Sequence, residues 1–342
     1  MSPLTDPSFL PFKLDPVGRR VLWLRLDAAR RREAAFLDER AIGADDAGGW
    51  LPLEALDAFA AGDAPSADGV FHIGHCGSTL LSRLLEAWPG VQALREPLPL
   101  RTVAEAWPTR HGALARLSAD ELDGALQALW RAWSRPLPPA TRTVIKATSS
   151  CNALAAPLLD AQPGMRAVLL DVALRPYLAA LLKSPAATLD AAVAAPERLA
   201  SLMDAGVGDG LRLHALSLPQ QCAMGWVAER LRFARLATGA LGDRMLRVDF
   251  DALLDSPRDV LARVASHLSL PVDGVDAAVA APAWGRYAKA QDHGYGRDDR
   301  AHDLALSLQR HAPQVEEGER WVAEFLARHP DVAAAVLDGD AG

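Results

Sequence analysis

The strongest candidate for a chemical site in the 342-residue sequence is a run of small residues at 74–79. The run reads Gly-His-Cys-Gly-Ser-Thr and follows an apolar segment, 70–73, that predicts a buried parallel strand. A helical pattern follows, with apolar residues at Leu80, Leu81, Leu84, Leu85 and Trp88. A strand, a glycine loop and a helix in this order direct backbone N–H groups and a helix N-terminus at one spot, which suits a phosphate or a sulfate.

This loop differs from the loop that binds ATP in P-loop enzymes. That loop requires a glycine, four further residues and then Gly-Lys-Ser/Thr, whose lysine meets the β- and γ-phosphates. Here Gly74 and Gly77 are too close together, and no lysine precedes Ser78 or Thr79. Taken alone, the loop is compatible with an anion site or with a plain strand-to-helix turn.

The wider stretch resembles the sulfotransferase superfamily, whose members transfer a sulfuryl group from 3′-phosphoadenosine-5′-phosphosulfate (PAPS). Residues 75–80, His-Cys-Gly-Ser-Thr-Leu, stand where that family has Lys/Arg-Ser-Gly-Thr-Thr-Leu/Trp. Residues 88–91 and 95–97 look like the part that follows in tyrosylprotein and bacterial sulfotransferases. There a glutamate seven residues after a proline serves as base, and Glu96 stands at that spacing from Pro89.

Two later stretches are similar to the same family. Residues 143–146, Thr-Val-Ile-Lys, look like the strand that delivers the catalytic lysine, here Lys146. Residues 244–253 and 267–271 look like the family's late strand and helix. The resemblance implies a P-loop NTPase-like sulfotransferase fold, PAPS as donor substrate without a metal, and a small-molecule or carbohydrate acceptor.

The resemblance also implies roles for individual residues. Glu96 would take the proton from an acceptor hydroxyl, and Lys146 would meet the bridging oxygen as negative charge develops there. His75 stands where the family has lysine or arginine, and a neutral imidazole would bind an anion more weakly. Cys76 is interpreted as a small filler at the helix N-terminus. Cytosolic members use a histidine two residues after the lysine as base; Thr148 stands there, which favours Glu96.

The residues that bind the 3′-phosphate in this family are not all present here. The family uses an arginine at a strand end and a serine eight residues later. Counted from the next apolar strand, these positions are Asp171 and Ala179, and a carboxylate would repel the phosphate. A loop longer by about a turn would bring Arg175 and Ser184 into place, with Lys183 beside them. We favour this second alignment, in which Asp171 caps the helix.

A late stretch at 282–300 is rich in glycine, basic and aromatic residues. The family closes the nucleotide site with a late basic loop, although a solvated surface loop would have a similar composition. The predicted catalytic residues are Glu96 and Lys146, and no metal ligands are predicted. The predicted donor-binding residues are Gly74, His75, Cys76, Gly77, Ser78, Thr79, Arg175, Ser184 and Lys289.

The elements that must position these residues alternate between strand and helix. Four apolar runs predict strands: 70–73, 143–146, 167–170 and 244–248. Alternation of this kind predicts an α/β fold with a central, mostly parallel sheet and helices on both faces. Ligands then bind beyond the carboxyl ends of the strands. Residues 1–68 are predicted to be an appended unit of strand and helix without chemistry, and residues 69–342 the sulfotransferase-like domain.

Composition bounds the remaining possibilities. A net charge of −7 argues against a general nucleic-acid binder. The three cysteines show no metal-ligand spacing and are odd in number, which fits a reducing cytoplasm. We find no signal-peptide pattern and no uncharged apolar run long enough to span a membrane, so we expect a cytoplasmic protein. Only four basic residues are lysines, which with the high alanine content indicates a compositionally biased bacterial genome.

Two other functions stay open. A P-loop kinase for a small molecule would use the same kind of loop, but the loop lysine and a clear acidic Mg²⁺ ligand are missing. A degenerate sulfotransferase-like protein that binds or acts as a scaffold without catalysis would explain the departures at His75 and in the 3′-phosphate region. The sequence does not indicate the acceptor or the oligomeric state.

Overall fold

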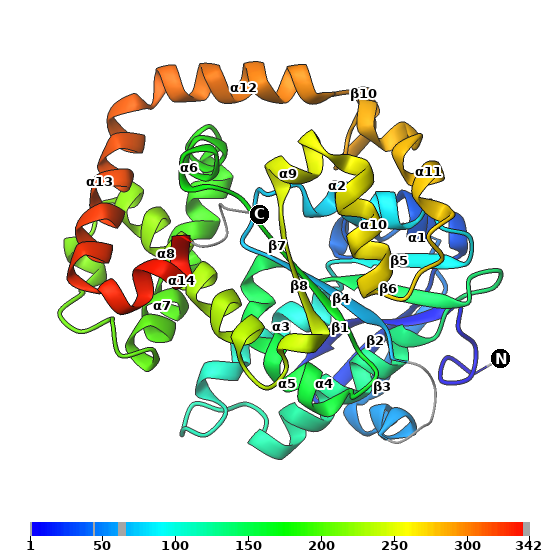
Figure 1. The fold of residues 1–342 in the computed structure, drawn as a ribbon. Coiled ribbons are helices and arrows are strands. Elements are labelled where there is room, and N and C mark those ends of the chain that lie inside the picture. The colour runs from blue at the N-terminus through cyan, green and yellow to red at the C-terminus, as the bar shows by residue number, and fades with distance from the viewer. Residues whose placement is uncertain (1, 44, 61–65, 338–342) are drawn as a thin grey trace.

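A parallel sheet of five strands forms the centre of the computed structural model, which describes residues 2–43, 45–60 and 66–337 (Figure 1). Every neighbouring pair in it runs parallel. The order across the sheet is β5 (Val91–Arg95), β6 (Arg142–Lys146), β4 (Asp68–His72), β7 (Ala167–Asp171) and β8 (Met245–Asp249). The first of these strands in the sequence, β4, therefore lies in the middle. The loops beyond it diverge to either side, which is where such sheets bind ligands.

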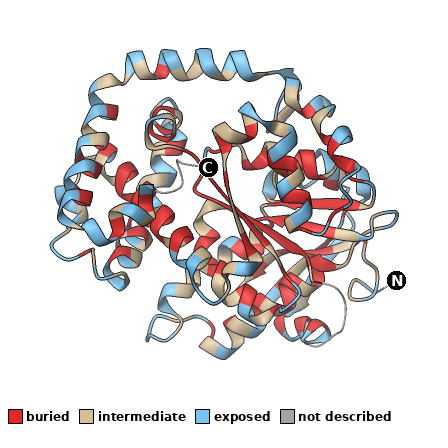
Figure 2. Ribbon diagram, in the orientation of Figure 1, coloured by how far each residue is buried: buried red, intermediate tan, exposed pale blue. Residues whose placement is uncertain are grey.

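The strands are buried on both faces because helices cover both (Figures 1 and 2). In β4, β5 and β7 every residue is buried. Figure 1 shows α2 (Ser78–Leu85) and α10 (Pro257–His267) on one face. The other face carries α3 (Leu98–Ala106), α4 (Ala119–Ser134), α5 (Ala155–Ala161) and α8 (Leu218–Thr238). The predicted α/β fold with a central parallel sheet and helices on both faces is confirmed.

Several strand ends carry charged side chains into this apolar interior, and each is paired. Asp68 accepts from Arg142 Nε at 2.9 Å, and Asp171 accepts from Arg247 Nη2 at 2.8 Å. Lys146 forms an ion pair with Glu96. Buried charges without partners would cost several kcal/mol each, so the pairing is a condition for placing them there.

A second, antiparallel sheet is formed by β1 (Phe9–Asp15), β2 (Arg20–Arg25) and β3 (Gly48–Pro52). It packs on α3 and α4, where the indole Nε1 of Trp133 donates to the carbonyl of Pro11 at 3.0 Å. Helix α1 (Ala28–Glu33) follows β2. The chain then passes the edge strand β5, where Leu37 N donates to Arg95 O (2.7 Å) and Leu98 N to Leu37 O (3.1 Å). The N-terminal unit therefore reaches the end of the central sheet.

A group of helices lies beside the β7 and β8 edge of the central sheet (Figure 1). Its members, besides α8, are α6 (Leu174–Leu182), α7 (Pro185–Asp204), α13 (Ala312–Arg328) and α14 (Pro330–Leu337). Helix α12 (Arg297–Arg310) crosses from the hairpin β9 (Arg286–Tyr287) and β10 (Ala290–Gly294) to this group. The remaining helices are α9 (Phe250–Asp255) and α11 (Gly274–Val279). Among the described helices none can cross a membrane alone; α6 and α7 pass that test only together, bent by 115°.

Candidate functional site

The loop between β4 and α2 has the conformation of a tight strand-to-helix turn. Gly74, His75 and Gly77 have φ angles of 93°, 52° and 73°. Gly77 precedes α2 as its N-cap residue, and a Cβ atom placed on it would lie 1.9 Å from the ring of Phe250. Position 77 therefore requires glycine both for its backbone angle and for space. The N-terminus of α2 begins directly afterwards with Ser78 and Thr79, which are both buried.

Cys76 and His75 contribute little positive charge or reactivity to this loop. Cys76 is fully buried, its thiol donates to Leu170 O at 3.3 Å, and burial raises its pKa to about 12. A thiol in that state packs but does not act as a nucleophile. His75 is exposed toward the cavity, and desolvation, followed by nearby lysine charges, lowers its pKa, so little positive charge is expected there at pH 7.

Glu96 and Lys146 meet at the ends of adjacent strands. In the parallel register Arg95 pairs with Lys146, and Glu96 N donates to Lys146 O at 2.7 Å. The ammonium group of Lys146 forms an ion pair with Glu96, and the Thr148 hydroxyl donates to the other carboxylate oxygen at 3.3 Å. Lys146 is 1% exposed and Glu96 16%. Glu96 also has φ 53°, a conformation that non-glycine residues rarely adopt and that is often found at functional sites.

A cavity of about 340 Å³ lies between the glycine loop, these strand ends and the hairpin β9–β10. Seven of the predicted site residues line it: His75, Gly77, Ser78, Thr79, Glu96, Lys146 and Lys289. Four further basic residues also line it: Lys183, Arg286, Arg297 and Arg300. Glu96 is the one acidic side chain among the described residues of the lining. Three of the four lysines in the sequence face this cavity, so it is suited to a ligand with several negative charges.

The cavity also has an apolar side that sequence reasoning did not assign. Phe250, Leu254, Trp284 and Leu304 line it together with Tyr287. Trp284 lies in the basic and aromatic stretch that the sequence singles out, but Phe250 and Leu304 come from α9 and α12, whose approach to the loop is not encoded in any local pattern. A pocket with aromatic walls and cationic ends suits a nucleotide, whose base is flat and whose phosphates are charged.

Four predicted donor-binding residues do not line this cavity. Gly74 and Cys76 lie in the turn behind it. Arg175 is half exposed and donates to Glu319 in α13 at 2.7 Å. Ser184 caps α7 by accepting from Ala187 N at 3.3 Å.

The reason for this placement lies at the end of β7. The strand continues through Asp171, which is buried against Arg247 and Arg230 and does not cap α6. The N-cap of α6 is Ala173, so Arg175 falls in the first turn of the helix and faces α13. Lys183, expected only as a neighbour, is the residue of this segment whose charge reaches the cavity.

The roof of the cavity is held by polar contacts of α12 and the hairpin. Lys183 and the Tyr295 hydroxyl both donate to Asp303, at 3.1 and 3.2 Å. Arg300 is ion-paired with Asp251 at 2.9 Å, and its guanidinium lies 4.9 Å from the ring centroid of Phe250.

One buried arginine hydrogen-bonds the β9–β10 hairpin to the N-terminal unit. Arg83 in α2 donates to Ala288 O at 2.7 Å and to Arg32 O and Glu33 O at 3.0 and 3.1 Å. It therefore joins the turn that carries Lys289 to the end of α1, and the N-terminal unit takes part in shaping the mouth of the cavity.

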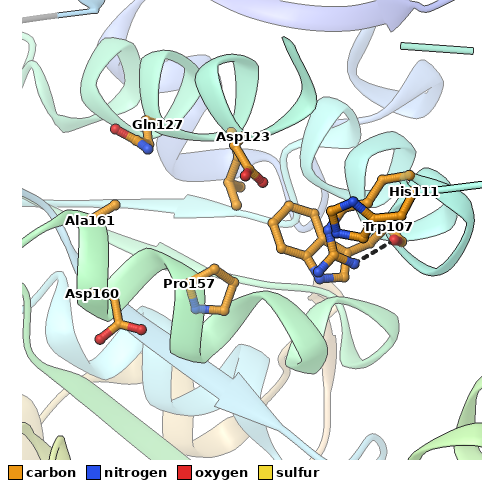
Figure 3. Close-up of a pocket in the computed structure, with 9 residues that line it drawn as sticks. Trp107, His111, Asp123, Gln127, Pro157, Asp160 and Ala161 are labelled. Carbon is orange, nitrogen blue, oxygen red and sulfur yellow. Dashed lines mark hydrogen bonds between the residues drawn. The ribbon is translucent and has the colours of Figure 1, made fainter. Parts of the chain in front are cut away.

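A larger depression of about 470 Å³ lies elsewhere, between α4, α5 and the end of α3 (Figure 3). Arg110 covers the ring of Trp107 at 4.2 Å and donates to the Trp107 carbonyl at 2.7 Å. Asp123 and Asp160 reach this depression from facing helices. It contains none of the predicted site residues. We therefore assign the chemistry to the smaller cavity. Within the described residues, no group of three or more His, Cys, Asp or Glu side chains could hold a metal ion.

Comparison with known proteins gives structural likenesses only. No protein-family model matches the chain. No curated protein matches it in sequence. Among solved structures, it is similar to a sulfotransferase domain from the curacin biosynthetic pathway, with 12% identity and a TM-score of 0.40 over 76% of this chain and 97% of that domain.

Two further solved structures are similar at the same level. A sulfotransferase from Mycobacterium avium has 12% identity and a TM-score of 0.37, covering 75% of this chain and 78% of that one. A sulfotransferase from Alicyclobacillus acidocaldarius has 13% identity and a TM-score of 0.34, covering 73% and 96%. Because these TM-scores are below 0.5, no functional conclusion rests on the likenesses.

Proposed function

We propose that the protein is a sulfotransferase that transfers a sulfuryl group from PAPS to a hydroxyl or amine of a small-molecule or carbohydrate acceptor. The observation that carries this proposal is the convergence of the glycine loop, Lys146 and Glu96 on one cavity that three of the four lysines line. PAPS combines a flat base with several negative charges, and the aromatic and cationic walls of this cavity match both features.

Different residues of the cavity would bind each part of the donor. The N-terminus of α2, with the Ser78 and Thr79 hydroxyls, would hold the 5′-phosphosulfate. The aromatic side formed by Phe250 and Trp284 suits the adenine. Lys183 and Arg300 line the same cavity and would supply the charge for the 3′-phosphate, in place of Arg175 and Ser184.

The chemical step follows from the Glu96–Lys146 pair. Lys146 would leave Glu96 when the donor arrives and donate to the oxygen that bridges sulfur and phosphorus. Glu96, freed from the lysine, would accept the proton of the acceptor hydroxyl. The acceptor oxygen forms a bond to sulfur, the sulfur–oxygen bond to the nucleotide breaks, and 3′-phosphoadenosine 5′-phosphate (PAP) leaves with the negative charge that Lys146 stabilises.

The same ion pair would also suit a nucleotide-binding protein without catalysis. In that case Lys146 and Glu96 would serve only to neutralise each other at the strand ends. Substituting either residue would then change the stability of the fold, and there would be no turnover to lose. A loss of turnover with retained nucleotide binding therefore separates the two functions.

The test is PAP formation from PAPS, measured over a panel of hydroxyl and amine acceptors with PAP affinity measured alongside. We expect Glu96→Gln to keep nucleotide affinity and to lower turnover by about 10²–10⁴. Lys146→Ala should lower turnover by about 10²–10³. Lys13→Ala, which removes the lysine outside the cavity, is the control and should turn over like the parent. If both site variants match the parent on an identified acceptor, the catalytic assignment is wrong.

A further inference from the structure

The last residue of β4 is a histidine whose two ring nitrogens both bind the backbone of the site. His72 is 6% exposed and lies directly before the glycine loop. Its Nδ1 accepts from Gly74 N at 3.0 Å, and its Nε2 lies 3.0 Å from Ala147 O. The ring therefore bridges the first glycine of the loop and the residue that follows Lys146.

These partners fix the chemical form of the ring. Gly74 N–H can only donate, so Nδ1 must carry a lone pair; Ala147 O can only accept, so Nε2 must carry the hydrogen. One neutral tautomer meets both requirements. Burial, followed by the charge of Lys146, lowers the pKa of His72 well below its ordinary value, which agrees with a neutral ring.

The main chain of His72 is held as well. Asn152 Nδ2 donates to His72 O at 2.9 Å and to Glu229 in α8 at 2.5 Å. Glu229 is buried and ion-paired at 2.6 Å with Arg198, which donates to Ser149 O at 2.9 Å. The segment after Lys146 is thus tied to His72 on one side and to α7 and α8 on the other, so the ring cannot shift without breaking a buried network.

We propose that His72 is a positioning residue that locks the glycine loop to the end of the strand that carries Lys146. The inference rests on the proposed function, because it concerns the geometry in which the loop and Lys146 would bind the same donor nucleotide. His72 lines the cavity, but with both nitrogens occupied by backbone groups it has no free lone pair to accept a proton from an acceptor. It acts through Gly74 and Ala147 and not on the substrate.

The test compares His72→Leu with His72→Gln. Leucine leaves Gly74 N–H and Ala147 O buried without partners, whereas the glutamine amide offers one donor and one acceptor. We expect His72→Leu to weaken PAP binding and lower kcat by about ten- to a hundredfold, and His72→Gln to recover most of both. His267→Leu is the matched control, because its Nε2 also binds a strand carbonyl, Ala167 O at 3.1 Å, at the opposite end of the sheet. It should lower Tm and leave the PAP Kd within about twofold.

Two measurements on the wild-type protein keep the proposal decidable if His72→Leu does not fold. Nitrogen chemical shifts of the His72 ring at pH 7 should show the Nε2–H tautomer, and the Gly74 amide should exchange slowly with solvent. The positioning role of His72 would be contradicted by an Nδ1–H tautomer or by a Gly74 amide that exchanges fast. It would also be contradicted if His72→Gln had PAP affinity and kcat as low as those of His72→Leu. If the wild-type protein does not bind PAP, the proposed function fails. The tautomer and the exchange rate still show whether His72 holds the glycine loop to Ala147.

Discussion

The floor and the roof of the cavity are built in opposite ways. The floor consists of Ser78, Thr79, Lys146 and Glu96 at strand ends and a helix start. Ser78, Thr79 and Lys146 are buried, and Lys146 and Glu96 are bound to each other. The roof consists of the hairpin β9–β10 and α12, whose cations are more exposed; Arg297 is 61% exposed and pairs with an equally exposed Asp255. The floor keeps a fixed geometry, while the roof supplies charge.

This difference separates two kinds of effect. A buried group in a water-poor site has strong, directional interactions, so changes in the floor should alter turnover and folding. Exposed charges are screened by salt and keep little geometry, so changes in the roof should alter nucleotide affinity and its salt dependence. Three substitutions test this difference.

The largest effect is expected at Gly77 in the floor. Gly77→Ala adds a Cβ that would lie 1.9 Å from Phe250, and it places alanine at φ 73°. Strain and overpacking together should cost about 2–5 kcal/mol of unfolding free energy and abolish measurable PAP binding. Thermal denaturation and calorimetry check both effects. Gly124→Ala in α4, where nothing lies within 4 Å, is the control and should be neutral or slightly stabilising. A Gly77→Ala protein that binds PAP normally would contradict the described loop.

A smaller effect is expected at Arg300 in the roof. Its side chain is 22% exposed, lines the cavity and is already paired with Asp251. Arg300→Ala should weaken PAP by about 3- to 30-fold, leave kcat unchanged and make the affinity less sensitive to salt. PAP titrations at two salt concentrations measure this, with Arg20→Ala in the N-terminal sheet as an exposed control. A fall in kcat at saturating donor would show that the roof takes part in the chemistry.

No effect on the nucleotide is expected at Arg175. Its partner is Glu319, and it does not line the cavity. Arg175→Ala should change PAP affinity by less than about twofold, because an exposed ion pair contributes about 0–1 kcal/mol and only to folding. Lys183→Ala, at the C-cap of α6, serves as the comparison and should weaken PAP binding. A tenfold loss at Arg175 would restore the alignment that the sequence favoured.

The sequence predicted the floor better than the roof. Apolar runs identify four of the five central strands, and parallel strands end at one edge, so Lys146 could be expected beside the glycine loop. Strand β5, which carries Glu96 to Lys146, was not predicted, and Glu96 was proposed from the resemblance. The places of Arg175 and Ser184 could not be predicted in this way, because the start of α6 depends on Asp171 staying in β7 and binding Arg247. His72 was overlooked because it stands inside an apolar run and its two partners are backbone groups, which no side-chain motif reveals. Phe250 and Arg300 reach the cavity only through long-range packing of α9 and α12.

The N-terminal unit shows the same limit. Its sequence has no chemical motif, yet Leu37 pairs with the backbone on both sides of Glu96, and Arg83 binds the end of α1. Such contacts arise between segments that are distant in the sequence, and no local periodicity encodes them. The division into units at 1–68 and 69–342 stays a prediction.

Calorimetric titration with PAP and with ATP plus Mg²⁺ tests whether the cavity binds the donor nucleotide of sulfuryl transfer. The loop lacks the lysine that meets the β- and γ-phosphates of ATP, and the cavity offers cations beyond the loop for a 3′-phosphate. We predict that PAP binds at one site at least about tenfold more tightly than ATP, a difference of about 1.4 kcal/mol or more. Equal or tighter binding of ATP would rule out the proposed donor site and favour a phosphoryl-transfer enzyme.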